Sequence, residues 1–226
     1  MRAILLVDPA GDSLRGAHAP FAQNRGRISR YDPEVSVFFA HPPELDASDW
    51  ADLRALTGPG GTASLRRRLS PIPDDWTLLR TFHLVVYSSA GLETRPDDEA
   101  LILGPDDVDE MLALVAQAQP GPFARRTIEL GRYLGFRDDD GQLIAMAGER
   151  MRPPGWGEIS AVATAERARG HGLAERLIRA VGAHIVARGD TPFLHTSADN
   201  PARALYERLG FELVDEVDLE IVQAAV

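Results

Sequence analysis

A strand, a glycine-containing turn, a helix and a second strand follow one another in the C-terminal half of this 226-residue chain. The apolar segment Gly157–Thr164 predicts the first strand, and Phe193–Ser197 predicts the second. Between them, apolar residues recur at helical spacing from Leu173 to Ile185, which predicts an amphipathic helix over about 172–188. Strands joined by such a helix lie parallel in one sheet, so this segment requires a sheet with a helix packed against it.

The segments around this crossover predict an α+β fold with a mixed, mostly antiparallel sheet and flanking helices. Asp138–Gly141 separates two apolar segments and indicates a hairpin turn. Asn200 is a typical N-cap and Gly210 a typical C-terminal glycine, and they bound a predicted helix over 200–209. The other predicted elements are strands over 100–103, 133–137, 143–150 and 211–222, a helix that begins at 104–107, and a short helix over 123–130.

The polar stretch Ser88–Glu99 lies between two apolar segments and is the best candidate for a domain boundary. We therefore predict a smaller α+β domain over residues 1–95 and a larger domain over 96–226. Within the first domain, the sequence predicts strands over 3–7, 35–40 and 82–87 and a helix over 47–56.

Composition narrows the class of function. The chain has no cysteine, which excludes disulfides and a cysteine nucleophile, and its six histidines show no metal-ligand spacing. A net charge of −10 argues against a nucleic-acid partner, and no segment has the length of a membrane span. The first 95 residues carry 11 basic and 11 acidic side chains, so the excess acid lies in the C-terminal half. That excess would attract a cationic amine or simply favour solubility, and we expect a cytoplasmic protein.

The turn Arg167-Ala168-Arg169-Gly170-His171-Gly172 connects the first strand of the crossover to its helix. Its glycines permit backbone angles that other residues avoid, and the first amides of the helix have no internal partner. Those amides lie at the positive end of the helix dipole, and two arginines add guanidinium groups suited to phosphate oxygens. The turn lacks the Gly-Lys-Ser/Thr of nucleotide triphosphatases and the third glycine of dinucleotide folds. On these residues alone it is either a pyrophosphate site or an ordinary strand-to-helix turn.

The same turn, written Arg167-x-x-Gly170-x-Gly172 and followed by Leu173-Ala174, resembles the acyl-CoA signature of the GCN5-related N-acetyltransferase (GNAT) superfamily. The segment from Asn200 to Glu212 resembles the second signature of that family, at the expected separation. The resemblance covers about 99–222 and is closest to the FR47-like branch, which includes glycine N-acyltransferase-like proteins. It implies the GNAT acyl-CoA N-acyltransferase fold for residues 96–226. Residues 1–95 would then be a degenerate, non-catalytic GNAT-like half that lines the acceptor pocket.

The resemblance also implies where the co-substrate acetyl-CoA would bind. The main chain of Val162 and Ala163 would pair with the pantetheine arm, and amides of the glycine turn would hold the pyrophosphate. Asn200 would contact the pantetheine or phosphate region. The implied cofactor-binding residues are Val162, Ala163, Arg167, Ala168, Arg169, Gly170, His171, Gly172, Leu173, Ala174, Asn200 and Tyr206, and no metal is implied.

Amide formation requires a neutral amine to attack the thioester carbonyl, a base that removes a proton, and an acid that protonates the sulfur. The resemblance places Tyr206 as the acid, and a packing role is the alternative. Glu149 and Glu158, both on predicted central strands, are the candidate bases, although nearby arginines could simply pair with them. His195 lies on the strand after the long helix and either lines the cleft or has a structural role.

The leading interpretation is an enzyme that moves an acetyl group from acetyl-CoA to the primary amine of a small molecule or amino acid. The loop Pro153–Trp156 could wall the acceptor site, which would favour a small acceptor. The alternatives are a CoA-binding sensor that has lost catalysis, and an acetyltransferase of protein N-termini or lysines. A homodimer is compatible with each of these.

Overall fold

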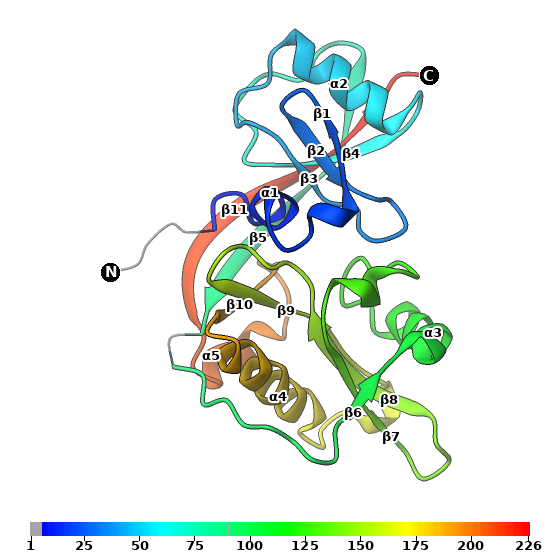
Figure 1. Ribbon diagram of the computed structural model, residues 1–226, viewed down its shortest axis with the longest axis vertical. Coiled ribbons are helices and arrows are strands. Elements are labelled where there is room, and N and C mark those ends of the chain that lie inside the picture. Colours follow the sequence, from blue (N-terminus) through cyan, green and yellow to red (C-terminus); the bar gives the residue numbers. More distant parts are fainter. Residues whose placement is uncertain (1–5, 90) are drawn as a thin grey trace.

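The computed structural model describes residues 6–89 and 91–226 (Figure 1). The strands are β1 (Ala22–Arg25), β2 (Ile28–Tyr31), β3 (Phe39–Ala40), β4 (Thr62–Arg66), β5 (Trp76–Ser88), β6 (Leu101–Leu103), β7 (Tyr133–Arg137), β8 (Leu143–Glu149), β9 (Trp156–Thr164), β10 (Thr191–Ser197) and β11 (Glu212–Ala224). The α-helices are α1 (Pro9–Arg15), α2 (Ala47–Thr57), α3 (Val108–Ala118), α4 (Leu173–Ala187) and α5 (Arg203–Arg208). Short 3-10 helices are η1 (Ala19–Phe21), η2 (Pro105–Asp107), η3 (Thr127–Leu130) and η4 (Glu166–Ala168). No helix within the described ranges combines the length and apolar character of a membrane span.

Eight strands form the larger sheet, in the order β4-β11-β5-β10-β9-β8-β7-β6. Strands β9 and β10 pair in parallel and are joined through α4, and the other neighbouring pairs in this sheet are antiparallel. The predicted crossover and the predicted mixed, mostly antiparallel α+β sheet are therefore confirmed. A second, smaller sheet has the order β1-β2-β3 and lies beside α2 (Figure 1).

The long strands β5 and β11 join the two halves of the chain. They pair from Glu212 opposite Ser88 to Ala224 opposite Trp76, and they run between the upper and lower parts of the molecule (Figure 1). Strands β4 and β5 come from before residue 95, yet they belong to the same sheet as β6 to β11. The division into domains at residue 95 stays a prediction, and the halves share one hydrogen-bonded sheet.

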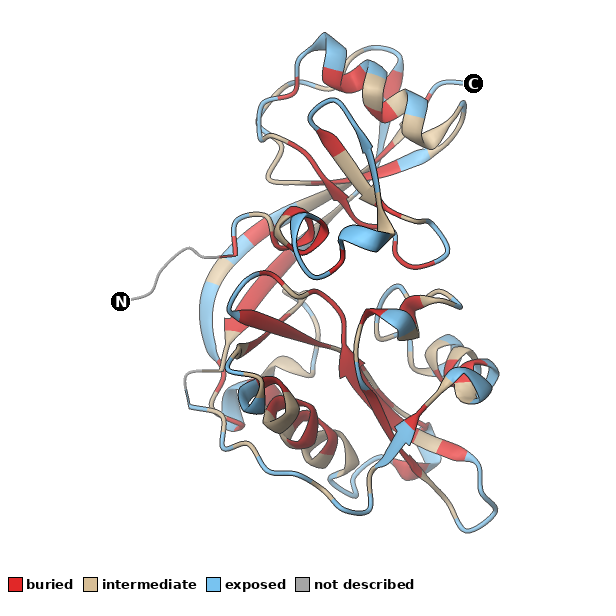
Figure 2. Cartoon of the chain, in the orientation of Figure 1, coloured by how far each residue is buried: buried red, intermediate tan, exposed pale blue. Residues whose placement is uncertain are grey.

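Helices α3 and α4 cover opposite faces of the central strands. Ala145 and Ala147 of β8 belong to the buried cluster that includes α4, whereas Met146 belongs to the cluster that includes α3. This is the alternation expected when both faces of a strand are covered. Burial is accordingly concentrated on β8, β9 and the inner side of α4 (Figure 2).

A β-bulge in β9 reverses this alternation. Ser160 pairs with Gly148 and Ala163 pairs with Met146, so two residues of β9 oppose the single Ala147 of β8. Ala161 has a φ of 52°, which a residue with a Cβ atom adopts at a cost. Ile159 packs on the α4 side, whereas Ala161 packs on the α3 side. The bulge therefore turns the second half of β9 relative to the first.

Several predicted boundaries were wrong. The strand expected over 35–40 is only β3, because Asp32 accepts a hydrogen bond from the amide of Glu34 and starts a turn. The helix expected over 123–130 is only η3, whose Thr127 hydroxyl donates to the carbonyl of Val35 and accepts from the amide of Ala124. The strand expected over 3–7 lies mostly outside the described residues.

Candidate functional site

A cavity of about 1090 Å³ lies where β9 and β10 separate. The two strands pair only between Trp156–Glu158 and Thr191–Phe193, and beyond these residues their facing edges diverge. Residues 159–164 of β9 form one side of the cavity, and residues 194–197 of β10 form another. Backbone groups on the diverging edges are not paired with each other, so they are available to a ligand.

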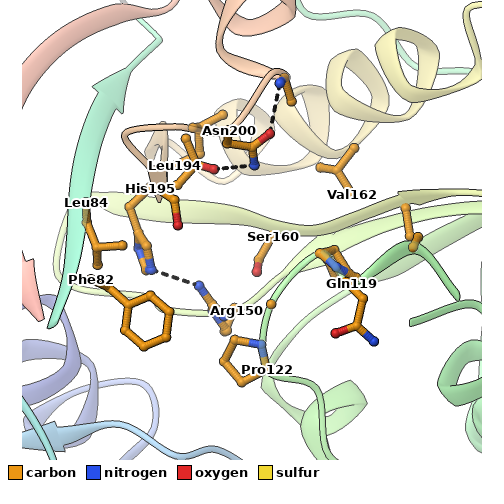
Figure 3. Close-up of a pocket in the computed structure, with 18 of the residues that line it drawn as sticks. Phe82, Leu84, Gln119, Pro122, Arg150, Ser160, Val162, Leu194, His195 and Asn200 are labelled. Carbon is orange, nitrogen blue, oxygen red and sulfur yellow. Dashed lines mark hydrogen bonds between the residues drawn. The ribbon is translucent and has the colours of Figure 1, made fainter. Parts of the chain in front are cut away.

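A third side of the cavity comes from distant parts of the chain. It contains no charged side chain, and we call it the uncharged wall. Residues 118–122, from the last residue of α3 onward, also line the cavity (Figure 3). The uncharged wall consists of Val37, Phe38, Thr62, Ser64, Phe82, Leu84, Leu219 and Ile221.

The glycine turn leads from the end of β9 into α4. Gly170 and Gly172 have φ values of 82° and 74°, so both use the left-handed region that favours glycine. The amide of Arg176 donates to the carbonyl of Gly172, whereas the amides of residues 170–175 make no hydrogen bond within the described part of the chain and can bind a ligand.

Five of the predicted cofactor-binding residues line the cavity, and the other predicted positions of the turn lie outside its lining. The cavity-lining set is Val162, Ala163, Arg169, Asn200 and Tyr206, and the remaining set is Arg167, Ala168, Gly170, His171, Gly172, Leu173 and Ala174.

The two arginines of the turn have different surroundings. Arg167 donates to Asp138 Oδ2 at 2.6 Å and to Gln142 Oε1 at 3.0 Å, both on the β7–β8 hairpin side. Arg169 lines the cavity, and its side chain makes only one long contact with the described residues, at 3.4 Å from the carbonyl of Thr164. Only Arg169 is therefore placed to meet an anion in the cavity without first losing an ion pair.

Asn200 forms a turn before α5 and does not cap the helix. Its Oδ1 accepts from the amide of Ala202 at 2.8 Å, and its Nδ2 donates to Thr196 Oγ1 at 2.6 Å (Figure 3). The helix begins at Arg203, later than predicted, because the Asn200 side chain closes a local turn in place of a helical one.

Tyr206 lies on α5 and is 7% exposed, with its ring packed against Tyr87 and Phe211. Burial raises the pKa of its phenol to about 12. The hydroxyl group is therefore protonated at neutral pH. It makes no hydrogen bond to another residue of the described ranges, so it remains available to a ligand in the cavity.

Arg150, Glu158 and His195 form a buried network beside the cavity. Arg150 donates to Glu158 through Nε at 3.0 Å and through Nη2 at 2.8 Å. His195 Nδ1 lies 2.8 Å from Glu158 Oε1, and its Nε2 lies 3.2 Å from Arg150 Nη2 (Figure 3). Arg150 and His195 line the cavity, whereas Glu158 is fully buried behind them.

The hydrogen bonds of this network define its charge. A guanidinium group only donates, so His195 Nε2 must accept from Arg150, and Nδ1–H then donates to Glu158. Burial lowers the pKa of His195, which agrees with a neutral ring. Burial by itself would raise the pKa of Glu158, but Arg150 and His195 together hold it well below its usual range. Arg150 is thus a cation, Glu158 an anion and His195 neutral.

Neither predicted base reaches the cavity wall. Glu149 is 1% exposed and is bound by Arg188 of the α4 end, with Nη1–Oε2 at 3.0 Å, and by Arg152 at 3.4 Å. Glu158 is held by Arg150 and His195. Both carboxylates are therefore occupied by cationic or N–H partners. This agrees with the alternative that nearby arginines simply pair with them.

Some cavity-lining residues could not be identified from the sequence. The loop Pro153–Trp156 does not line the cavity, because Trp156 turns inward onto Phe193. Residues 119–122 take that place, and their Pro-Gly-Pro sequence was a visible turn signal. Phe38 carries no comparable signal, because its approach to the cavity depends on long-range packing.

The arrangement provides a partly uncharged cleft lined by the Arg169 cation and a protonated phenol, and the free amides of the glycine turn follow Arg169 in the chain. This combination suits a thiol ester with a phosphate-bearing carrier. Among the described residues, no three His, Asp or Glu side chains are grouped so as to hold a metal ion.

Comparison with known proteins agrees with this geometry. The FR47-like protein family profile matches residues 133–218. The crystal structure of a GNAT-family protein from Novosphingobium aromaticivorans is 36% identical, with a TM-score of 0.87, over 98% of this chain and 99% of that one. A GCN5-related N-acetyltransferase from Kribbella flavida shares the fold, with 17% identity and a TM-score of 0.67 over 97% of this chain and 95% of its own. No curated protein matches the chain in sequence.

The matched segment contains the cleft strands, the glycine turn and α5, and the similarity to the first structure extends over both halves of the chain. The expected fold is confirmed, and it implies acyl transfer with an acyl-CoA as co-substrate. The chain belongs to the GCN5-related N-acetyltransferase (GNAT) superfamily, in its FR47-like branch.

Proposed function

We propose that this protein transfers an acetyl group from acetyl-CoA to the primary amine of a small molecule or amino acid. The observation that carries the proposal is the cavity itself, which joins the free edge of β9 to the uncharged wall. A carrier bound along β9 would place its thioester between Val162 and Tyr206, with the uncharged wall left for the acceptor.

The donor side is assigned to β9, the glycine turn and Arg169. The main chain of Val162 and Ala163 would pair with the pantetheine arm, as an added strand pairs with a free sheet edge. The free amides at the start of α4 and the Arg169 guanidinium suit the pyrophosphate. Asn200, already fixed by Thr196 and Ala202, would border the pantetheine.

Tyr206 is proposed as the general acid. The amine nitrogen bonds to the thioester carbonyl carbon, the carbon–sulfur bond breaks, and the departing sulfur takes the proton of the Tyr206 hydroxyl. The amine nitrogen loses its proton to solvent, and solvent returns a proton to the Tyr206 phenolate. A phenol whose pKa is raised to about 12 is fully protonated before the reaction, as a proton donor must be.

Glu158 is proposed to act through its neighbours and not as the base. Its lowered pKa makes it a poor proton acceptor, and its oxygens already accept from Arg150, His195 and the amide of Met151. Glu149 is proposed to anchor the end of α4 to the sheet. Removal of the amine proton is therefore assigned to solvent within the open cleft.

A small acceptor is favoured over a peptide, because residues 37–38 and 119–122 enclose the cavity from two sides. The test is to incubate the protein with acetyl-CoA and a panel of small amines, amino acids and peptides, and to follow free thiol and product mass. Transfer to small amines supports the proposal. Tight binding of acetyl-CoA without thiol release on any acceptor would instead favour the sensor alternative, and turnover restricted to peptides would favour a protein acetyltransferase.

A further inference from the structure

Arg150 has donor groups that the protein does not use. A guanidinium group carries five N–H donors, and here Nε and Nη2 are bound by Glu158 and His195. Its Nη1 makes no hydrogen bond to a residue in the described ranges. The residue is 5% exposed and lines the cavity, as do Pro122 and Ser160 (Figure 3).

The position of Arg150 is held on several sides. Glu158 binds it through two parallel hydrogen bonds, and the ring of Phe38 lies 4.8 Å from its guanidinium carbon. His195 contacts both, with its ring 6.0 Å from that of Phe38. The titratable phenols that act on Arg150 are Tyr31 and Tyr133, whose pKa values are raised by burial, so both are neutral.

No acidic side chain opposes Arg150 on the cavity surface. The uncharged wall contains none, and Asp199, the one acidic side chain among the cavity-lining residues, lies in the turn before α5. Glu158 lies on the buried side of Arg150, so the ion pair forms a dipole whose positive end faces the cavity. A cationic acceptor such as a polyamine finds no partner here, whereas an anion finds one.

We infer that Arg150 binds a carboxylate within the cavity and that this carboxylate belongs to the acceptor, which is then an amino acid or a similar amino carboxylate. The free edge of a guanidinium group matches a carboxylate in shape and charge, and the burial of Arg150 strengthens the bond. Glu158, His195 and Phe38 are positioning residues for Arg150. The inference rests on the proposed transfer reaction and names the acceptor class for it.

A carboxylate at Arg150 has a second conceivable source, the far end of a dicarboxylic acyl chain on CoA. The first experiment separates the two. Each proteinogenic amino acid is tested beside its C-terminal amide, with acetyl-CoA as the donor. An amine that has no carboxylate is tested with succinyl-CoA and with butyryl-CoA. Free thiol and product mass are the readouts. We expect kcat/KM to be about 10- to 100-fold higher for the acid than for its amide, because one charge-assisted hydrogen-bonded contact is lost.

The second experiment changes Arg150. Arg150→Lys keeps a cation opposite Glu158 and removes the planar group, so the acid should lose its advantage over the amide through a higher KM. Arg150→Met with Glu158→Met removes the whole pair and guards against a folding defect in the single variant. Arg188→Lys is the matched control, because Arg188 also pairs with a buried glutamate but does not line the cavity.

A direct binding measurement makes the test independent of turnover. The CoA complex is titrated calorimetrically with N-acetyl amino acids and with their amides. Preference for the acid that disappears in Arg150→Lys and persists in Arg188→Lys supports the inference, even if no acceptor is turned over and the proposed reaction fails. Equal affinity for acid and amide, or a preference that survives both Arg150 variants, overturns it while leaving transfer to other amines possible. In the first experiment, faster transfer from succinyl-CoA than from butyryl-CoA, without any preference for the amino acid over its amide, would reject the acceptor assignment.

Discussion

Glu158 accepts two hydrogen bonds from Arg150, with Nε–Oε2 at 3.0 Å and Nη2–Oε1 at 2.8 Å, and both side chains are buried. The pair joins the end of β8 to the start of β9, at the point from which β9 and β10 diverge. One residue of the pair faces the cavity and the other lies behind it. The stability of the cleft and the chemistry of its surface therefore depend on the same contact.

Breaking this pair on one side should be costly. Glu158→Gln leaves the Arg150 cation buried without its anion and should lower the free energy of unfolding by about 3–5 kcal/mol. Replacing both residues by methionine should cost much less, because no uncompensated charge remains. Urea unfolding followed by circular dichroism measures both. A double variant as unstable as the single one would contradict this account.

Removal of the Tyr206 hydroxyl should slow the transfer step. We expect Tyr206→Phe to reduce kcat about 100-fold, the range for loss of a general acid, with little change in the KM for acetyl-CoA. Tyr87→Phe is the matched control, because that hydroxyl binds Glu207 and Arg203 and does not line the cavity. Steady-state thiol release measures both variants. If they have the same kcat, Tyr206 is a packing residue.

The two arginines of the glycine turn should differ in their effect on acetyl-CoA binding. Arg169→Gln should weaken binding about tenfold, because it removes a cation from the cavity. Arg167→Gln should have little effect, because Arg167 is held by Asp138 and Gln142. Isothermal titration calorimetry at one fixed salt concentration compares them. A larger loss for Arg167→Gln would place the pyrophosphate on the other side of the turn.

A Cβ atom at Gly172 should disturb the donor site through the backbone alone. Gly172 has a φ of 74°, and apart from its chain neighbours no heavy atom lies within 4 Å of the position that a Cβ would take. Gly172→Ala should cost about 1–2 kcal/mol in stability and, if the turn shifts to relieve that strain, weaken acetyl-CoA binding about 5- to 30-fold.

Gly189→Ala is the control for this prediction, since Gly189 has a φ of 90°, equally open surroundings and a place at the other end of α4. Thermal unfolding should show a similar loss for both variants. Calorimetry should show weaker binding for Gly172→Ala alone. Unchanged affinity in Gly172→Ala would contradict the expected link between the conformation of the turn and acetyl-CoA binding.

Stability should fall as the pH drops below about 6.5, in part because of His18. This ring is buried, with Nδ1 3.0 Å from the Tyr31 hydroxyl and Nε2 3.1 Å from the Leu130 carbonyl, and burial lowers its pKa to about 4. Below pH 6.5 His18 is protonated in the unfolded chain, whereas in the folded protein it stays neutral until about pH 4. The contribution is therefore intact above pH 6.5, and about 3 kcal/mol is lost between pH 6.5 and 4.

Urea unfolding at a series of pH values tests this prediction. His18→Gln should flatten the curve between pH 6.5 and 5 but not abolish its slope, because burial also lowers the pKa of His41 and His195. An identical slope in wild type and His18→Gln would show that folding does not lower the pKa of His18.

Local signals in the sequence were sufficient for most of the C-terminal half. The crossover from β9 through α4 to β10, the β7–β8 hairpin and the α3 helix follow from periodicity and turn chemistry, which act over a few residues. Two boundaries failed where the side chain of Asp32 or Asn200 closes a local turn, and another failed where a side chain bonds to a distant segment. That side chain is Thr127, which binds the carbonyl of Val35.

The sequence by itself determined the superfamily resemblance and the region where the donor is proposed to bind, because the glycine turn and its helix form one contiguous segment. Only the tertiary structure decided which charged side chains face the cavity. Asp138 binds Arg167 away from the cavity, and Arg150 lies between Glu158 and the cavity. Phe38, from the other half of the chain, packs against Arg150. Ion pairs form between groups that the whole sheet brings within 3 Å, and no spacing along the chain encodes that distance.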